Sequence, residues 1–404
     1  MDGKRRKLAA CVYVVHERVV PLSAAAFASC HPQRCLLTHS LVASLQLLQP
    51  AGPLAVLRPA PASVEALQEY HAKAYTDALA QPVLADCDEE DEPAAARELR
   101  LAAGLSHDCP PFAGALEYAR LVAGGSLAAA DVLMLRQNGQ AGGASVAVHW
   151  DGGRHHALRS AASGFCYVND VVLALQRLLS RGFRRVLYVD VDIHHCDAVA
   201  GAFARTPAVL TVSMHRREPG FFPGSGSESD VGVGRGAGFS LNLPLKAGLS
   251  DATFCAAFDA LAAEAAALYR PDATVLCLGA DGLAGDPLGG WCLTPAALRH
   301  AALTARAWGA PLLLLGGGGY DEANAARAWA IVTAAIAGEE HAAKTEPGAP
   351  VPDHAHLLAY GPSFAMWATA GNRSDENERV DVLARCGALV GVLRRHLGGE
   401  DVLS

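Results

Sequence analysis

Short apolar runs alternate with helical patterns along much of the chain. Five runs predict buried strands, because each is short, mostly apolar and bounded by turn residues: Ala144–Val148, Val186–Val191, Val209–Val212, Thr274–Leu278 and Leu312–Leu315. Three segments carry helical composition and capping signals: Asp251–Tyr269 after Ser250, Thr294–Trp308 with Pro295 at its first position, and Glu322–Ala337 before Gly338. Strands that are apolar on both faces and separated by helices predict an α/β fold, a parallel sheet covered on both sides in a single domain.

The composition of three stretches predicts irregular structure. Arg216–Gly238 is rich in Gly, Ser and Pro, which predicts a long loop of the kind that is usually functional or disordered. Lys344–Pro352 is a second irregular stretch, and the acidic run Asp86–Glu92 is expected to be a solvated loop.

Composition excludes several classes of protein. The chain has 404 residues, of which 51% are hydrophobic and 18% charged, so it is not a disordered or low-complexity protein. A net charge of −8 argues against holding nucleic acid by bulk electrostatics. No apolar run reaches the roughly 18 residues that span a bilayer, so no membrane association is expected. Eleven cysteines without a Cys-x-x-Cys pair predict reduced thiols in an intracellular protein.

The strongest chemical signal lies in the run from Asp190 to Asp197. Asp190, Asp192 and His194 alternate, which puts them on one face of an extended segment, and His195 and Asp197 follow. A carboxylate in a strand buried on both faces is costly unless it is paired or bound to a cation. This pattern therefore predicts a metal site, and the alternative is a buried ion-pair network.

Polar residues also follow the other predicted strands. The segments 149–156, 279–282 and 316–320 each begin where a strand ends, and the ligand crevice of a parallel sheet lies at that edge. These segments should converge on one site if their strands are neighbours. The metal ligands that fit best are one imidazole and two carboxylates, a set that suits a catalytic Zn²⁺ with an open position: Asp192, His194 and Asp281.

The remaining polar residues of these segments then need partners. Asp190 and Asp197 could accept from the ring nitrogens of His155 and His156. The glycines at 316–319 are followed by Tyr320 and not by Lys, so they suit a close backbone approach better than a phosphate cradle. The Tyr320 hydroxyl could donate to a developing oxyanion.

The ordered set of motifs resembles the zinc-dependent histone deacetylases, most closely the class I branch. The resemblance rests on residues 152–157, 163–170, 190–195, 219–224, 279–287 and 316–320, and it covers roughly residues 11 to 395. It implies the arginase/deacetylase fold, a mostly parallel eight-stranded sheet between helical layers. It also implies hydrolysis of the acetyl amide of lysine side chains in histones or other proteins. A basic tip (1–10) and a short tail (396–404) would flank the catalytic domain (11–395).

The resemblance also implies a role for each matching residue. Zn²⁺ would be held by Asp192, His194 and Asp281. His155 would pair with Asp190 and stay charged, His156 would pair with Asp197 and act as general base and then acid, and Tyr320 would polarise the acetyl carbonyl. The expected substrate-binding residues are Asp108, which grips substrate backbone, Gly164, Phe165, Phe222 and Leu288 around the lysine stem, and Arg34 in an inner acetate-release channel. A K⁺ ion would lie behind the zinc, largely on carbonyls, at Asp190, Asp192, His194, Ser213 and Met214.

The chain departs from the family pattern at three positions. Cys196 and Ala198 stand where the family usually has glycine, and a left-handed turn at Cys196 would cost about 1–2 kcal/mol. Arg154 replaces a usually apolar residue beside the histidine pair and is expected to reach the rim of the substrate tunnel.

Two other functions stay open. The acidic run 86–92 keeps a deacetylase of acetylpolyamines or other small amides as the alternative, and an inactive deacetylase-like scaffold is a second one. The resemblance favours a nuclear protein, with some cytoplasmic presence possible, and Lys4–Lys7 as a candidate import signal. The chain has no long charged tail before Ser404, which favours an enzyme that is active without co-repressor partners.

Overall fold

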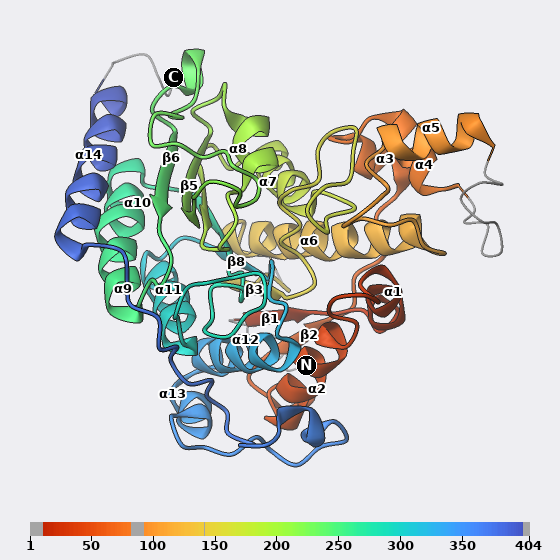
Figure 1. Cartoon of the computed structure of the whole chain (residues 1–404), viewed down its shortest axis with the longest axis vertical. Helices are drawn as coiled ribbons and strands as arrows, with labels where there is room; N and C mark the ends of the chain where they lie inside the picture. The colour runs from red at the N-terminus through yellow and green to blue at the C-terminus, as the bar shows by residue number, and fades with distance from the viewer. Residues whose placement is uncertain (1–10, 82–92, 141, 399–404) are drawn as a thin grey trace, which may run out of the picture.

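The computed structural model describes residues 11–81, 93–140 and 142–398. These residues form one eight-stranded sheet in which every pair of neighbours is parallel, in the order β2-β1-β3-β8-β7-β4-β5-β6 (Figure 1). The strands are β1 (Cys11–Val14), β2 (Ala55–Leu57), β3 (Val146–His149), β4 (Val186–Asp190), β5 (Val209–Arg216), β6 (Ser240–Leu245), β7 (Ala273–Cys277) and β8 (Leu312–Leu315). The predicted single-domain α/β fold with a parallel sheet is therefore confirmed.

All five predicted strands are present: Leu312–Leu315 has the predicted bounds, and the bounds of the other four differ by one to a few residues. The largest difference is β5, which continues to Arg216 because its second half pairs in register with β6. The three strands that the apolar pattern missed are short or interrupted by polar residues. β1 has four residues, β2 is an edge strand of three residues with Val56 50% exposed, and β6 carries Asn242 and Pro244.

The predicted helices are confirmed, and their caps act as expected. Thr294 accepts from the backbone N–H of Ala296 at the start of α11, and Gly338 ends α12. The segment Asp251–Tyr269 is helical throughout, but a π-helical segment (Asp259–Ala263) divides it into α9 and α10. The helices are α1 (Val19–Ala26), α2 (Arg34–Ser44), α3 (Val64–Gln68), α4 (Lys73–Leu79), α5 (Ala94–Ala102), α6 (Ala115–Gln137), α7 (Asp170–Ser180), α8 (Asp197–Phe203), α9 (Asp251–Phe258), α10 (Glu264–Tyr269), α11 (Pro295–Ala307), α12 (Glu322–Ala337), α13 (Glu339–Ala342) and α14 (Arg379–Leu397).

Helical layers cover both faces of the sheet, as Figure 1 shows. Alternate residues of β4 point to opposite sides: Leu187 and Val189 join the apolar cluster shared with α2, α9, α11, α12 and α14, and Val186 and Tyr188 join the one shared with α6, α7 and α8. β4 is therefore packed against apolar side chains on both faces up to Asp190, the last residue of the strand.

Two helical segments are longer and more apolar than expected from the sequence, in which no apolar run reaches the roughly 18 residues that span a bilayer. By length and composition α6 and the run from α9 to α10 could cross a membrane, but 72% and 50% of the residues in their most apolar stretches are buried in the fold. Packing against the sheet and neighbouring helices accounts for that composition, since a buried helix is apolar on most of its surface.

Several predictions concern the ends and loops. Residues 217–238 form a loop as expected, with one short 3₁₀ turn at Gly234–Gly236. Of the predicted irregular stretch Lys344–Pro352, Lys344 and Thr345 belong to a 3₁₀ turn (Ala343–Thr345), and residues 346–352 are irregular. Helix α14 runs to Leu397, two residues into the predicted tail. The ten cysteines in the described ranges are free thiols, as expected. The basic tip with Lys4–Lys7 and the acidic run 86–92 lie outside the described residues.

Candidate active site

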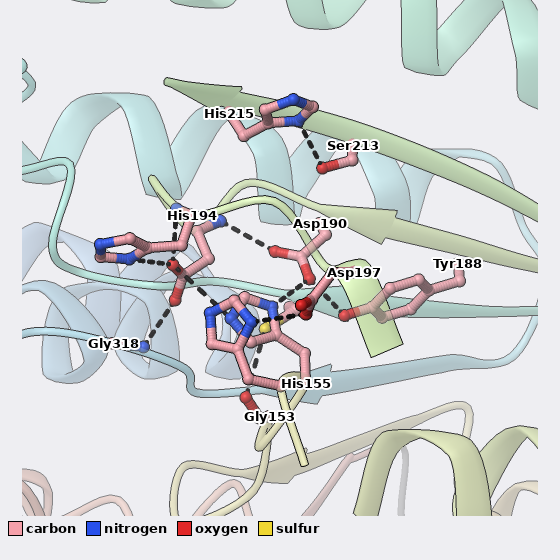
Figure 2. Close-up of polar contacts among 12 residues, drawn as sticks. Gly153, His155, Tyr188, Asp190, His194, Asp197, Ser213, His215 and Gly318 are labelled. Atoms are coloured by element: carbon pink, nitrogen blue, oxygen red, sulfur yellow. Dashed lines mark hydrogen bonds and ion pairs between the residues drawn. The ribbon is translucent and has the colours of Figure 1, made fainter. Parts of the chain in front are cut away.

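The polar segments meet because their strands are neighbours. β3, β8, β7 and β4 are consecutive in the sheet, and all four run in the same direction. The loops that follow them therefore start along one edge of the sheet. Figure 2 shows residues from three of these loops close together there: His155 after β3, His194 and Asp197 after β4, and Gly318 after β8.

Three buried side chains form a compact donor set. Nδ1 of His194 lies 3.2 Å from Oδ1 of Asp192 and 3.0 Å from Oδ2 of Asp281. Each of the three residues offers one potential ligand atom, and these three atoms lie within 4.8 Å of one another. Asp192 and Asp281 are 1% and 0% exposed. Two carboxylates and one imidazole at this spacing are the ligands expected of a catalytic divalent metal.

Electrostatics supports a cation at this position. Burial and repulsion by Asp192 raise the pKa of Asp281. Burial alone would lower the pKa of His194, but hydrogen bonds to both carboxylates raise it to about 10. In the protein alone, a proton on His194 therefore supplies the positive charge that the two carboxylates require. A divalent cation would supply that charge directly, so the donor set fits the metal that the sequence predicts.

Backbone passes very close to these carboxylates, as the glycine run predicted. The N–H of Gly318 donates to Oδ2 of Asp192 at 2.6 Å. A Cβ atom placed on Gly318 would lie 2.1 Å from Oδ2 of Asp281, and one on Gly279 would lie 2.4 Å from Oδ2 of Asp192. No side chain larger than hydrogen fits between the β7 and β8 loops and the donor set.

The two adjacent histidines have opposite electrostatic environments. Nδ1 of His155 lies 2.7 Å from Oδ2 of Asp190 (Figure 2). Nδ1 of His156 lies 2.8 Å from Oδ1 of Asp197. Burial disfavours the charge on His155, but Asp190 and Asp192 outweigh it and raise the pKa to about 9. Burial and the neighbouring His155 lower the pKa of His156 to about 4. Near pH 7 the pair thus holds one imidazolium and one neutral imidazole, with ring centroids 4.0 Å apart.

Tyr320 is held from behind by a carboxylate that the sequence reading did not single out. Oδ2 of Asp286 accepts from the backbone N–H of Tyr320 at 2.7 Å and of Asp321 at 3.2 Å, and its Oδ1 accepts from the N–H of Leu288 at 2.9 Å. Asp286 therefore ties two predicted site residues, Tyr320 and Leu288, to one point. Its place in the motif 279–287 was the signal that could have found it.

Aromatic side chains and one glycine surround the histidines. The Phe222 ring lies 4.9 Å from His156, and the Phe165 ring lies 5.5 Å from Tyr320. A Cβ on Gly164 would approach His156 to 2.7 Å and Phe222 to 3.0 Å. Phe222 is 42% exposed, so this group runs from the buried centre to the surface.

The other predicted substrate residues are also placed. Leu288 is 42% exposed, and its backbone N–H donates to Asp286, which also accepts from the N–H of Tyr320. Asp108 is half-buried in the loop between α5 and α6, and its carboxylate has no hydrogen bond to another described residue. Arg34, the first residue of α2, donates to the carbonyl of Gly319 at 2.9 Å, next to Tyr320.

Two expectations about this chain's departures from the family pattern are wrong: the place of Arg154 at the tunnel rim and the strain at Cys196. Arg154 does not reach a rim: it is 5% exposed, and its guanidinium lies 5.2 Å from the Phe27 ring centroid. Its backbone N–H is bound by Asp170, which turns the side chain inward. Cys196 has φ −76°, so the left-handed strain considered for it does not arise. Asp197, the next residue, keeps its bond to His156.

One further support was not expected from the sequence. The hydroxyl of Tyr188 donates to Oδ2 of Asp190, the same atom that faces His155. Oδ1 of Asp190 accepts from the N–H of Asp192 at 2.9 Å. Tyr188 lies on β4 two residues before Asp190, so strand alternation puts both on one face, but its apolar surroundings gave no functional signal.

Comparison with known proteins agrees with this geometry. A family model described as the histone deacetylase domain matches residues 28–336. The chain is 39% identical over 347 residues to Histone deacetylase 8 of Danio rerio, covering 86% of each chain. It is 37% identical over 364 residues to Histone deacetylase 8 of Xenopus tropicalis (90% of this chain, 92% of the relative), and 39% identical over 335 residues to Histone deacetylase 6 of Arabidopsis thaliana (83% and 67%). With three quarters of its length matched by the family model, and with these relatives aligned over most of both chains, the chain belongs to the histone deacetylase family.

Proposed function

We propose that this chain hydrolyses the acetyl amide of Nε-acetyl-lysine in histones or other proteins, with Zn²⁺ at Asp192, His194 and Asp281. Family membership makes it a hydrolytic lysine deacetylase with a metal cofactor. The observation that carries the finer proposal is the histidine pair beside the donor set, with one member charged and the other neutral near pH 7.

The histidines divide the proton chemistry between them. When bound, Zn²⁺ would polarise the amide carbonyl and lower the pKa of a water molecule. Neutral His156 is free to take a proton from the attacking water, and Asp197 holds its other nitrogen and stabilises the imidazolium that results. The same imidazolium can return the proton to the lysine amine as the C–N bond breaks. His155, already positive, offsets negative charge that develops on the carbonyl oxygen.

Tyr320 and the aromatic side chains would orient the substrate. Burial and the nearby charge of Asp281 raise the pKa of Tyr320, so its hydroxyl keeps its proton and can donate to the carbonyl oxygen. Phe165 and Phe222 would flank the four-carbon lysine stem, with Gly164 and Leu288 beside them. An apolar surround suits an uncharged acetyl-lysine better than a free ammonium, whose burial is costly. Asp108, with its unused carboxylate, would accept from substrate backbone N–H groups.

A second cation is part of the proposal. K⁺ would bind behind the donor set, largely on carbonyls, at Asp190, Asp192, His194, Ser213 and Met214. The support is positional: Ser213 on β5 is the register partner of Asp190 on β4, so the segments that would supply these carbonyls are adjacent.

The decisive experiment pairs metal content with substrate choice. Purified protein should contain about one zinc per chain and release acetate from an acetyl-lysine peptide faster than from acetylspermidine. The His156→Ala variant should keep its zinc and lose turnover. Preference for acetylspermidine would favour the small-amide alternative, and a metal-free, inactive wild-type protein would favour the scaffold.

A nuclear location with chromatin as substrate belongs to the same proposal. The support is the name of the relatives, which refers to histones. Imaging of a tagged chain tests it, and replacement of Lys4–Lys7 by alanine tests whether that run directs import.

A further inference from the structure

A second group of metal-ligating side chains lies between α2 and the loop after β3. Cys35 and His39 are four residues apart on α2, so they lie on the same face of the helix. Asp151 follows β3, and its Oδ2 lies 3.0 Å from Nε2 of His39. Each residue offers one potential ligand atom, and these three atoms lie within 4.8 Å of one another. We call Cys35, His39 and Asp151 the α2 site; it shares no residue with the donor set of the candidate active site.

The α2 site is enclosed by the fold. Cys35 and Asp151 are each 5% exposed, and only 13% of the His39 side chain is exposed. The start of α2 is tied down next to Cys35, because Arg34 donates to the carbonyl of Gly319 at 2.9 Å. Two of the three side chains therefore stand on a fixed helix, and a metal site needs ligands that are held in place in this way.

A buried hydroxyl orients the imidazole of the α2 site. The Tyr13 hydroxyl lies 2.8 Å from Nδ1 of His39, and the two rings meet edge-on at 5.8 Å. Tyr13 is on β1 and fully buried, so it holds the ring with Nε2 directed at Asp151. Metal-bound histidines are commonly held through their second nitrogen in this way. With Nε2 on a metal, the Nδ1–H of His39 would donate to the Tyr13 oxygen.

The charges of the α2 site leave room for a cation. Burial alone would raise the pKa of Asp151, but the adjacent His39 lowers it, so Asp151 is ionised near pH 7. Burial and the negative charge of Asp151 raise the pKa of the Cys35 thiol, which keeps its proton. A divalent cation in place of that proton would face one thiolate and one carboxylate, and the site would have no net charge. The positive charges of Arg34 and Arg154 favour the thiolate.

We propose that the α2 site binds a second divalent cation, of the zinc class. A thiolate, an imidazole and a carboxylate are ligands that Zn²⁺ binds, and three protein ligands leave a fourth position for water. Mg²⁺ and Ca²⁺ do not fit, because they prefer oxygen ligands. On binding, the Cys35 S–H bond breaks, its proton leaves to solvent and a sulfur–metal bond forms, without oxidation or reduction. Because this proton must be displaced, the α2 site should fill only after the donor set.

A chain of hydrogen bonds without a metal is the alternative. Tyr13, His39 and Asp151 can form such a chain by themselves, and Cys35 would then add only one weak donor. The position of Cys35 favours the metal, because a hydrogen-bonded chain does not require a thiol there. A metal site requires a third ligand atom at this spacing, and Cys35 supplies it.

Cobalt spectroscopy separates the two, because it detects sulfur as a ligand. Zinc-loaded protein is titrated with Co²⁺, and absorption from sulfur-to-cobalt charge transfer should appear and saturate near one added equivalent per chain. Asp192, His194 and Asp281 include no sulfur, so cobalt bound at the donor set gives no such band. Excess Zn²⁺ should remove the band by displacing the cobalt, and a band that it leaves unchanged would contradict a site of the zinc class.

Three variants identify the ligand and its support. Cys35→Ala should lose the band, and Cys386→Ala, which removes a buried thiol on α14, should keep it. Tyr13→Phe keeps all three ligands and should weaken cobalt binding about 10- to 100-fold, since it removes only the contact that orients His39. Unchanged circular dichroism and zinc content at the donor set show that each variant is folded. No band in the wild type, or a band that persists in Cys35→Ala, would overturn the proposal.

The α2 site and the proposed function fail in different ways. A protein with a Cys35-dependent cobalt band that hydrolyses no acetyl-lysine peptide keeps the α2 site and loses the proposed function. An active deacetylase in which no thiol binds cobalt keeps the function and loses the α2 site.

Discussion

Replacement of Gly318 by alanine should damage the metal centre while leaving the fold intact. Gly318 lies in the loop after β8, and its N–H donates to Asp192. Its φ is not in the left-handed region, so alanine can adopt the same backbone conformation. The substitution therefore tests one thing, the space between this loop and the carboxylates.

The structure gives the size of the effect. The added Cβ would lie 2.1 Å from Oδ2 of Asp281 and 3.1 Å from Oδ2 of Asp192, where ordinary contacts begin at 3.4 Å. The loop or the Asp281 carboxylate must therefore move by about 1 Å. Displacements of that size in a catalytic site cost about 10²-fold in rate, and loss of support for a ligand costs about 10- to 100-fold in metal affinity.

Zinc affinity, measured by competition with a coloured chelator, and kcat/KM on an acetyl-lysine peptide are the readouts. Gly201→Ala is the matched control, because its Cβ meets nothing within 4 Å on helix α8, and it should leave both unchanged. A Gly318→Ala protein with wild-type zinc affinity and turnover would refute the claim that this glycine is required by the carboxylates.

Three further predictions concern turnover, metal removal and pH. Tyr320→Phe should lower kcat about 10²- to 10³-fold with zinc content unchanged, since it removes one donor to the carbonyl oxygen; near-normal turnover would remove Tyr320 from the mechanism. Chelation should lower the melting temperature, because it restores repulsion between Asp192 and Asp281, and Zn²⁺ should reverse the loss; an unchanged melting curve would argue against a bound cation. Burial lowers the pKa of His71 from 6.5 to about 4. Its contribution to the free energy of unfolding is therefore fully present above pH 6.5 and is lost progressively as the pH falls toward 4. His71→Gln, which can still accept from the N–H of Asn169, should reduce the acid-induced loss of unfolding free energy by up to about 1.4 kcal/mol per pH unit, measured by urea denaturation at pH 7 and 5.

Much of the centre was predictable because its signals are local. β4 is an unbroken apolar run, so the position of Asp190 at its end follows directly from the sequence. Alternation then places Asp192 and His194 on the same side, where the structure has them. Asp281 and Tyr320 could be added because each follows another apolar strand, and parallel strands bring their ends together.

Predictions failed where neighbours distant in sequence decide the structure. β6 is a strand because it pairs with β5, although Asn242 and Pro244 break its apolar pattern. The role of Asp286 depends on two backbone N–H groups more than 30 residues away in the chain, at Tyr320 and Asp321. Neither spacing nor composition encodes such a contact.

Arg154 shows how a single turn separates functions that adjoin in sequence. It precedes His155 directly, and chain proximity suggested a place at the surface of the same site. Gly153, at φ +88°, turns the chain, and Asp170 holds the N–H groups of Gly153 and Arg154 together. A Cβ at Gly153 would lie 2.8 Å from the backbone of Gly316, so this turn is packed against the β8 loop as well as hydrogen-bonded. The turn directs His155 toward Asp190 and sends the guanidinium to the opposite side, against Phe27. Arg154 therefore packs on Phe27, while His155 and His156 keep their contacts with Asp190 and Asp197.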